Sequence, residues 1–207
     1  LGLLSGEIRI KNIEAESPTI RLEQRSDGRV SWQFTDGNTE AATTETTSSQ
    51  EPSSFSIERL KVTNATLIYD AEGSGLISYD GVDLSLDWPE ITGPAVIAAS
   101  FQPAGTPVTL DAVIDGAASF IAGEVQTLRA DLDTGNGTLS FDGRGSTAGA
   151  LAGTLGLKTA NTDAFLQALG LGGADLPEKL GRSIDMTTDL TLTPDMLLSL
   201  RDFVADL

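Results

Sequence analysis

Histidine and cysteine are both absent from this chain of 207 residues, and each absence excludes a kind of chemistry. Without them the chain cannot build a His/Cys zinc site, a cysteine nucleophile or a Ser-His-Asp triad. Without cysteine there is also no disulfide framework, so the redox compartment is left open. Phosphate-binding loops of the GxxxxGK[ST] or GxGxxG type are missing, and positions 62–128 hold no Lys or Arg that could clamp a phosphate.

Positive charge is scarce as well. The chain has 13 Lys and Arg against 30 Asp and Glu, a formal net charge of −17. This balance argues against non-specific binding to nucleic acid and against docking by charge on an anionic membrane surface. No apolar run approaches the roughly 18 residues of a membrane helix, and no signal peptide is visible. The chain starts at Leu1, without Met and inside a strand-like pattern, so we expect a piece of a longer protein from which any targeting or anchoring segment has been cut away.

The main positive feature is alternation of apolar and polar residues with a period of two. The segment VDLSLDW at residues 82–88 is one of many such runs, which Gly-containing turns separate. Each strand then has one apolar face, and few helices are available to cover it. We predict a mainly β fold: a long antiparallel, curved or twisted sheet that forms a groove or an open barrel-like sandwich, with one short helix near 161–170.

The composition changes sharply at residues 35–54, which are rich in Thr, Ser and Glu and contain no Lys or Arg. Such a segment buries too little apolar surface to offset its ordering entropy, so we interpret it as a flexible linker or a long loop. The predicted organisation is an N-terminal strand and hairpin segment over 1–34, this linker over 35–54, and a main β domain over 55–207 with the short helix inserted.

Local signals refine this outline. Asn161 can cap the helix, and Gly170 can end it. Pro177 favours a second short helical turn through Leu180. The C-terminal segment MLLSLRDFVADL at 196–207 fits a strand with one bulge or a helix, and we favour the strand. The apolar residues in the strand before Gln102 are taken as Val96, Ala98 and Phe101, a spacing that suggests a bulge.

Two motifs resemble catalytic or metal-binding signatures. Asp133-Thr134-Gly135 matches the signature of aspartic proteases, but those enzymes need two such carboxylates and the chain has no second copy. We therefore favour a turn between strands. The segment 135–143 resembles a single calcium-binding β-roll repeat and does not recur. The paired acids Asp70/Glu72, Asp80/Asp83, Asp111/Asp115 and Asp131/Asp133 are interpreted as a solvated face.

The first 34 residues are the most specific stretch. A Ser-Gly opening at 5–6 is followed by spaced aliphatic residues, by Pro18-Thr19-Ile20-Arg21-Leu22, and by the hairpin DGRVSW at 27–32. This arrangement resembles the AsmA family of Gram-negative envelope proteins, with Ser31 in place of the usual Asn. The later strands and the short helix are similar to that family more loosely, for example where a strand ends in Tyr69-Asp70 before a Gly turn.

The resemblance implies a periplasmic protein, tethered to the inner membrane by a helix outside this fragment, with a groove-like sheet similar to bridge-like lipid transfer proteins. Its partners would be phospholipid acyl chains and the membrane. From the missing motifs and the acidic charge we expect no enzyme activity, no cofactor or metal, and no binding to nucleic acid. The expected function is to shield acyl chains on their way to the outer membrane, in outer membrane biogenesis.

The apolar strand positions supply a candidate groove lining. An ordinary dry core is the structural alternative, and a structural or adaptor β domain that binds proteins through sheet edges is the functional one. A carboxylate-based hydrolase is a third reading. The predicted lining residues are Ile8, Ile10, Ile20, Leu22, Val30, Trp32, Leu67, Tyr69, Leu84, Leu86, Val108, Leu110, Ala130, Leu132, Leu139 and Phe141.

Overall fold

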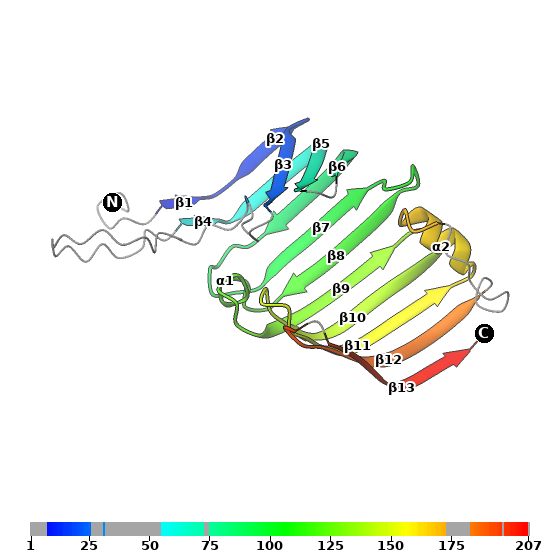
Figure 1. Ribbon diagram of the computed structural model, residues 1–207. Coiled ribbons are helices and arrows are strands. Elements are labelled where there is room, and N and C mark those ends of the chain that lie inside the picture. Colours follow the sequence, from blue (N-terminus) through cyan, green and yellow to red (C-terminus); the bar gives the residue numbers. More distant parts are fainter. Residues whose placement is uncertain are drawn as a thin grey trace.

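The described part of the chain forms one long, curved sheet that is not closed into a barrel, and a separate two-stranded pair (Figure 1). The structure is a computed structural model and describes residues 8–25, 31, 55–72, 75–172, 183–195 and 197–206. The linker predicted over 35–54, the turn at Asp27-Gly28 and the helical turn at 177–180 lie outside these residues. The division into 1–34, 35–54 and 55–207 stays a prediction.

Nine strands of the sheet follow one another in chain order as an antiparallel meander, which confirms the predicted fold class. The period-two alternation produces them, because every second side chain of a strand points to the same face. The strands of this meander are β5 (Arg59–Ala71), β6 (Gly75–Asp87), β7 (Ala95–Phe101), β8 (Val108–Ile114), β9 (Gln126–Asp133), β10 (Gly137–Gly145), β11 (Leu151–Thr159), β12 (Ile184–Leu192) and β13 (Leu198–Asp206).

The N-terminal strands pair in parallel, unlike the rest. β2 (Ile13–Glu16) and β3 (Thr19–Gln24) both lie alongside β5, at the sheet edge opposite β13. β1 (Ile8–Ile10) and β4 (Phe55–Ile57) form a separate parallel pair. The segments before and after residues 26–54 therefore run side by side in the same direction, a pairing that alternation alone does not predict.

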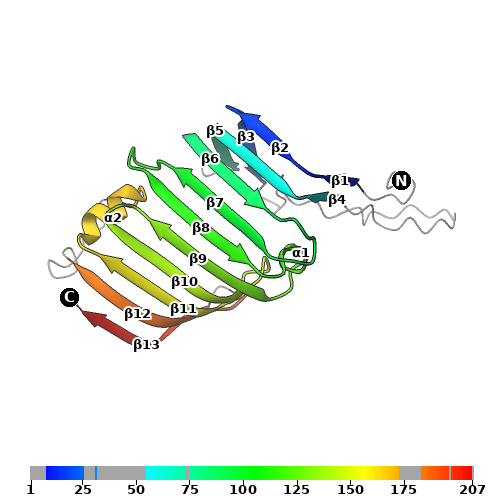
Figure 2. The same cartoon turned by 180° about the vertical axis from the view of Figure 1, so that it is seen from behind.

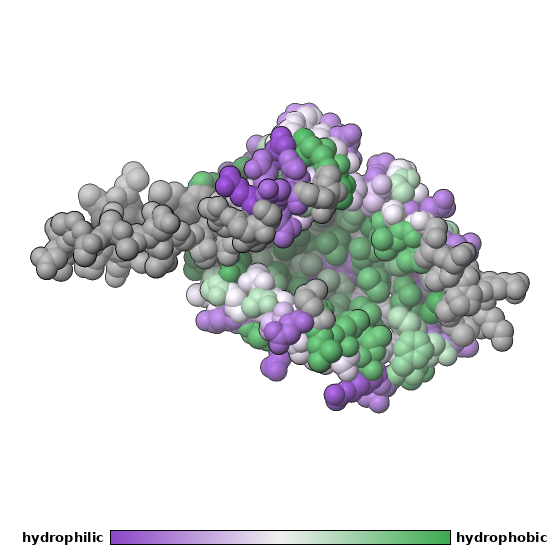
Figure 3. Space-filling model, viewed as in Figure 1, coloured by the Kyte–Doolittle hydropathy of each residue, from purple (hydrophilic) through white to green (hydrophobic). Residues whose placement is uncertain are grey.

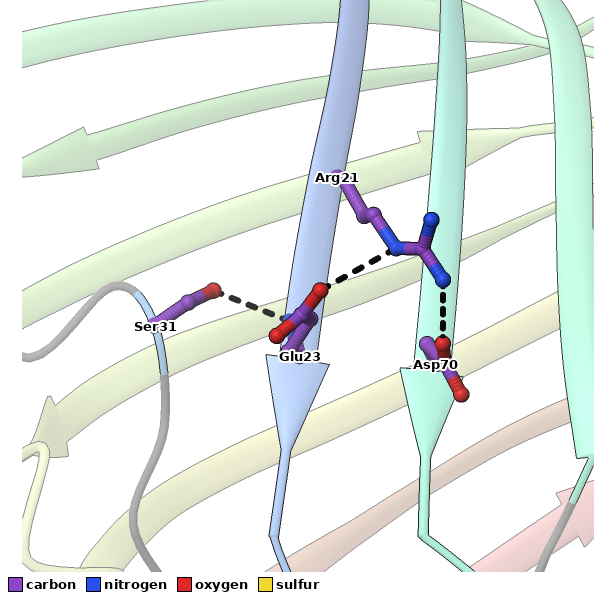
Figure 4. A network of polar contacts seen from close by, with 4 residues as sticks. All are labelled: Arg21, Glu23, Ser31 and Asp70. Carbon is purple, nitrogen blue, oxygen red and sulfur yellow. Dashed lines mark hydrogen bonds and ion pairs between the residues drawn. The ribbon is translucent and has the colours of Figure 1, made fainter.

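The polar side of the β3–β5 pair carries an ionic network (Figure 4). Arg21 Nη2 donates to Asp70 Oδ2 at 2.5 Å, and Arg21 Nε lies 3.2 Å from Glu23 Oε1. The hydrogen bond and charge of Asp70 raise the pKa of Arg21 above its ordinary value. The backbone N–H of Ser31 donates to the carbonyl of Glu23 at 2.9 Å. Ser31, which follows the predicted hairpin turn, therefore lies beside β3, which precedes it. These contacts support the register of the parallel edge.

The two helices among the described residues lie at opposite ends of the strands (Figures 1 and 2). Helix α2 (Thr162–Ala168) confirms the predicted helix, and the side chain of Asn161 caps it by accepting a hydrogen bond from the N–H of Ala164. Helix α1 (Ala117–Ile121) was not predicted. It has only five residues and no side-chain cap, so it leaves no periodic or capping signal in the sequence.

The C-terminal segment forms strand β13, as predicted. Its single bulge lies near Asp202, whose φ is 49°, and shifts the register against β12 between Thr187 and Asp189. Strand β7, in contrast, has an uninterrupted register with β8, so the bulge predicted from Val96, Ala98 and Phe101 is wrong. Ile97 and Ala99 lie in the apolar ladder instead, and Val96 is 48% exposed on the polar face.

Compensating irregularities bend the long β5–β6 hairpin. Val62 pairs with Leu84 and Ala65 with Val82, so β5 contains one extra residue at this point. The next pair is Leu67 with Tyr79, so β6 contains the next extra residue. Because one bulge offsets the other, the apolar side chains stay on one face of the hairpin on both sides of the bend.

Candidate functional site

The candidate site is the apolar face of the main sheet. Register places its side chains in rows that run across the strands, perpendicular to the chain direction. Two of these we call the apolar rows. The first apolar row is Leu84, Ala99, Leu110, Leu132, Leu139, Leu157 and Met186. The second is Leu86, Ile97, Ala112, Ala130, Phe141 and Leu155.

Every residue of the two apolar rows is only partly buried. Most of the buried residues lie instead near the two strand ends, and the others, Val62, Ala65 and Thr188, lie in the flanking strands β5 and β12. Next to α1, Ala95, Ile114 and Ala117 form a buried cluster. At the end where α2 lies, Val108, Phe165 and Ile184 are buried. A closed sandwich would bury the middle of the face most deeply, so this distribution indicates a face that is covered at its ends and open along its centre.

Space-filling representation shows the same arrangement. Hydrophobic side chains line a hollow between the N-terminal part of the sheet and the later strands, while hydrophilic side chains gather on the outer rims (Figure 3). Across β5 to β12, no Asp, Glu, Lys or Arg of the described residues falls on the apolar phase of a strand. The hollow can therefore accept an apolar ligand without desolvating a charge.

Glycines allow the backbones to approach closely within this face. Gly143 and Gly153 are directly opposite each other in β10 and β11. A Cβ at Gly143 would lie 2.4 Å from the carbonyl oxygen of Ala152, 2.6 Å from Cα of Gly153 and 2.7 Å from Cζ of Phe141. The Phe141 ring therefore extends along its own strand and covers the space that Gly143 leaves open. Aromatic covering of a strand glycine is a known way to stabilise a curved sheet.

The face can be compared with a lipid tail in size. Between β5 and β13 there are eight inter-strand spacings of about 4.8 Å, which give a length of about 38 Å. The hydrocarbon core of a bilayer is about 30 Å thick and contains two layers of tails. A single acyl chain lying along the apolar rows would thus occupy only part of the face.

A model of the AsmA family matches residues 1–197, nearly the whole chain. The chain belongs to the AsmA family. This confirms the resemblance seen in the first 34 residues and makes the chain a cell-envelope protein of the Gram-negative type. No curated protein and no solved structure matches it. Neither helix of this AsmA-family chain that the structure describes has the length and apolar character needed to cross a membrane.

The AsmA-family sheet brings most of the predicted lining residues onto one continuous face. The two apolar rows contain the predicted lining residues of β6, β9 and β10, and also Leu110 of β8. Ile20 and Leu22 of β3 lie beside Leu67 and Tyr69 of β5 on the same face, nearer the N-terminal edge. Their partial burial matches that of the rows.

Five other predicted positions differ from these. Val108 lies on the apolar face of β8, but its side chain is 0% exposed. It packs at the strand end and offers no accessible surface to a ligand. Ile10, with Ile8, lies in β1, which pairs with β4 and not with the main sheet. Val30 and Trp32 lie outside the described residues.

Several lining residues were missed. Ile97 and Ala99 were missed because β7 (AVIAASF) has apolar residues on both phases, and only its pairing with Leu86 and Leu84 selects one of them. The apolar residues of β11 and β12, Leu155, Leu157 and Met186, had a readable alternation but were not included. Their signal was present in the sequence.

The acidic motifs have structural roles. Asp133 Oδ1 accepts a hydrogen bond from the N–H of Gly135 at 2.6 Å, and Gly135 has a φ of 74°. Asp133-Thr134-Gly135 is thus the tight turn between β9 and β10. Asp80 accepts from Thr66, and Asp83 from the backbone of Asn64. Among the described residues, no group of three or more acids could hold a metal ion.

Proposed function

We propose that this AsmA-family chain is a non-enzymatic lipid-handling module of the periplasm, tethered to the inner membrane by a segment outside this sequence. Phospholipid acyl chains would lie along the apolar rows and be shielded from water between the two membranes. The module would thereby contribute to phospholipid transport from the inner to the outer membrane and to outer membrane biogenesis.

The observation that carries this proposal is the open centre of the apolar face. Its two apolar rows cross six or more strands without a charged side chain and without a covering layer from the described residues. Burial of hydrocarbon is worth about 0.8 kcal/mol for each CH₂ group, so an acyl chain would be held without any specific polar contact. The absence of a specific contact also suits a ligand that must slide.

The helices that cover the two strand ends favour one direction for the movement of a bound acyl chain. Helix α1 and the residues buried with it lie at one end of the strands, and α2 lies at the other. The rows themselves extend toward the two edges of the sheet. An acyl chain that followed the rows would cross the strands and move along the long axis of the sheet.

Photo-crosslinking tests the proposal. A benzoylphenylalanine placed at Leu132, in the first apolar row, should crosslink to phospholipid in cells of a Gram-negative bacterium whose lipids carry radioactive phosphate. The same group at the adjacent Asp131, on the opposite face, is the matched control. Equal labelling at the two positions, or no labelling at Leu132, would contradict the proposal.

A structural adaptor that binds proteins through a sheet edge has one observation in its favour. The edge strand β13 exposes Leu198, Leu200, Phe203 and Val204 by 50–70%. An adaptor predicts crosslinks from Phe203 to protein without lipid crosslinks from Leu132. The lipid proposal predicts the lipid crosslinks whether or not β13 binds another strand.

A further inference from the structure

Three residues with left-handed backbone conformation lie next to one another across the N-terminal part of the sheet. Ser17 has a φ of 50°, Asn64 of 52° and Gly81 of 67°. Ser17 separates β2 from β3, while Asn64 and Gly81 lie at the bulges of β5 and β6. Since β5 pairs with β2 and β3 on one side and with β6 on the other, the three residues form a line across neighbouring strands, which we call the crease.

The strand segments beyond the crease form a small sheet of their own, which we call the flap. It consists of Thr19–Gln24, Thr66–Ala71 and Leu76–Asp80. β6 pairs with β7 only through residues 83–87, so none of the flap pairs with β7. Strand β3 packs against β5, and it has no other substantial contact with a described element. Within the part of the chain that the structure describes, the flap is thus joined to the main sheet chiefly through the crease (Figures 1 and 2).

The flap continues the apolar face across the crease. Ile20 pairs with Leu67, and Leu67 with Tyr79; one step further, Leu22 pairs with Tyr69. These five side chains are partly buried. Ile77 of β6, which pairs with Tyr69, is 45% exposed. The apolar side of the flap therefore borders the hollow seen in Figure 3.

Polar contacts hold the crease in its present geometry. The N–H of Asn64 donates to Asp83 Oδ1 at 2.8 Å, and Asn64 Nδ2 donates to Ser17 Oγ at 2.9 Å. Thr66 Oγ1 donates to Asp80 Oδ1 at 2.8 Å. These bonds are exposed to solvent, where water competes with them. They can favour one angle of the flap without preventing another.

We propose that the crease is a hinge and that the flap closes over the N-terminal end of the apolar face when an acyl chain is bound there. This inference rests on the proposed function for its ligand. Hinges are a few residues at element ends or irregularities that absorb changes in φ and ψ, and the crease places three such residues in one line. Closure would remove from water both the bound chain and the apolar side of the flap.

The absence of cysteine permits a direct test, because introduced cysteines carry spin labels without background. One label at Ser78 in the flap and one at Thr187 in β12 report the angle of the flap. The control pair, Thr109 and Thr187, lies entirely in the main sheet. With vesicles of phosphatidylethanolamine and phosphatidylglycerol, the Ser78–Thr187 distance distribution should become narrower and shift by several ångströms, and the control distribution should stay unchanged. Lipid transferred to the same samples is measured by native mass spectrometry.

Lipid bound without a change in the Ser78–Thr187 distribution would overturn the hinge and leave the proposed function standing. If no lipid binds, the proposed function fails, and the hinge is decided without lipid by variants that loosen the crease. We expect Asp83→Ala to broaden the Ser78–Thr187 distance distribution. If that variant folds poorly, Thr66→Val replaces it, with the same expected result. Asp131→Ala, which removes an exposed acid on the same face in β9, should not broaden it. An unbroadened distribution in the loosened variants refutes the hinge.

Discussion

Asn64 donates a hydrogen bond from its side-chain Nδ2 to Oγ of Ser17 across 2.9 Å, and both residues have positive φ. The interruption between β2 and β3 thus lies directly against the bulge in β5. The backbone N–H of Ser17 also donates to the carbonyl of Thr63. Two irregularities that lie far apart in the sequence are therefore parts of one bend in the sheet.

Substitution of Asn64 tests this bend. Asn64→Ala should lower the free energy of unfolding by about 1–2 kcal/mol. The Cβ of alanine disfavours the left-handed conformation, and alanine lacks the polar side chain with which asparagine tolerates it. Asn64→Gly removes the same hydrogen bond but tolerates positive φ, so it should cost less. Denaturant titration measures both, and an equal loss in the two variants would show that φ is not the cause.

The close approach at Gly143 gives a second prediction. Gly143→Ala should destabilise the protein by about 1–3 kcal/mol, because its Cβ would meet backbone atoms of β11 that cannot move freely. Gly156→Ala is the matched control in the same strand pair, where the nearest atom is the movable Ser140 Oγ at 2.7 Å. Thermal unfolding should show a clearly larger decrease in Tm for Gly143→Ala. Equal decreases would remove the role given to the glycine pair.

A charge placed in the first apolar row should abolish lipid binding with little loss of fold. Leu132→Asp introduces a carboxylate that water still reaches in the empty groove but that a bound acyl chain would desolvate. The amount of co-purified phospholipid should decrease at least several-fold in native mass spectra of detergent-free protein. Asp131→Leu, on the opposite face, should keep its lipid. Lipid retained by Leu132→Asp would place the binding surface elsewhere.

The Arg21–Asp70 pair should stabilise the parallel edge in a manner that depends on salt. Because the folded-state pKa of Arg21 is raised, the contribution of its guanidinium is complete below the unfolded-state pKa and is lost as the pH rises through the folded-state value, far above neutrality. Arg21→Gln should therefore lower Tm slightly at low salt. The difference from wild type should shrink at 1 M salt, where the screening length is about 3 Å. A difference that is independent of salt would indicate packing of the Arg21 side chain instead.

Asp133 gives a test of the non-enzymatic proposal. Asp133→Asn keeps an oxygen that can accept from the N–H of Gly135, so stability and lipid binding should both stay at wild-type values. Asp133→Ala loses that acceptor and should be slightly less stable. A folded Asp133→Asn protein that fails to support function in the full-length protein would revive the carboxylate-based hydrolase.

Period-two alternation was enough to predict most of the sheet and most of its apolar face. Strand β9 has apolar residues on one phase only, so the side chains on its apolar face were identified correctly. β7 was assigned to the wrong phase because both of its phases are apolar, and register with β6 and β8 decides between them. Helix α1 was missed because five residues are too few for a helical period.

The sequence by itself determined a mainly β protein with one-faced strands, acids on the polar face, and membership of the AsmA family, because these follow from local alternation, composition and motif. Only the tertiary structure decided that the sheet stays open, that β2 and β3 pair in parallel with β5, and that Ser17, Asn64 and Gly81 meet in one line. Pairing between distant strands depends on register and chain path. Neither is encoded in any short window of residues, and both are set when the strands pack together.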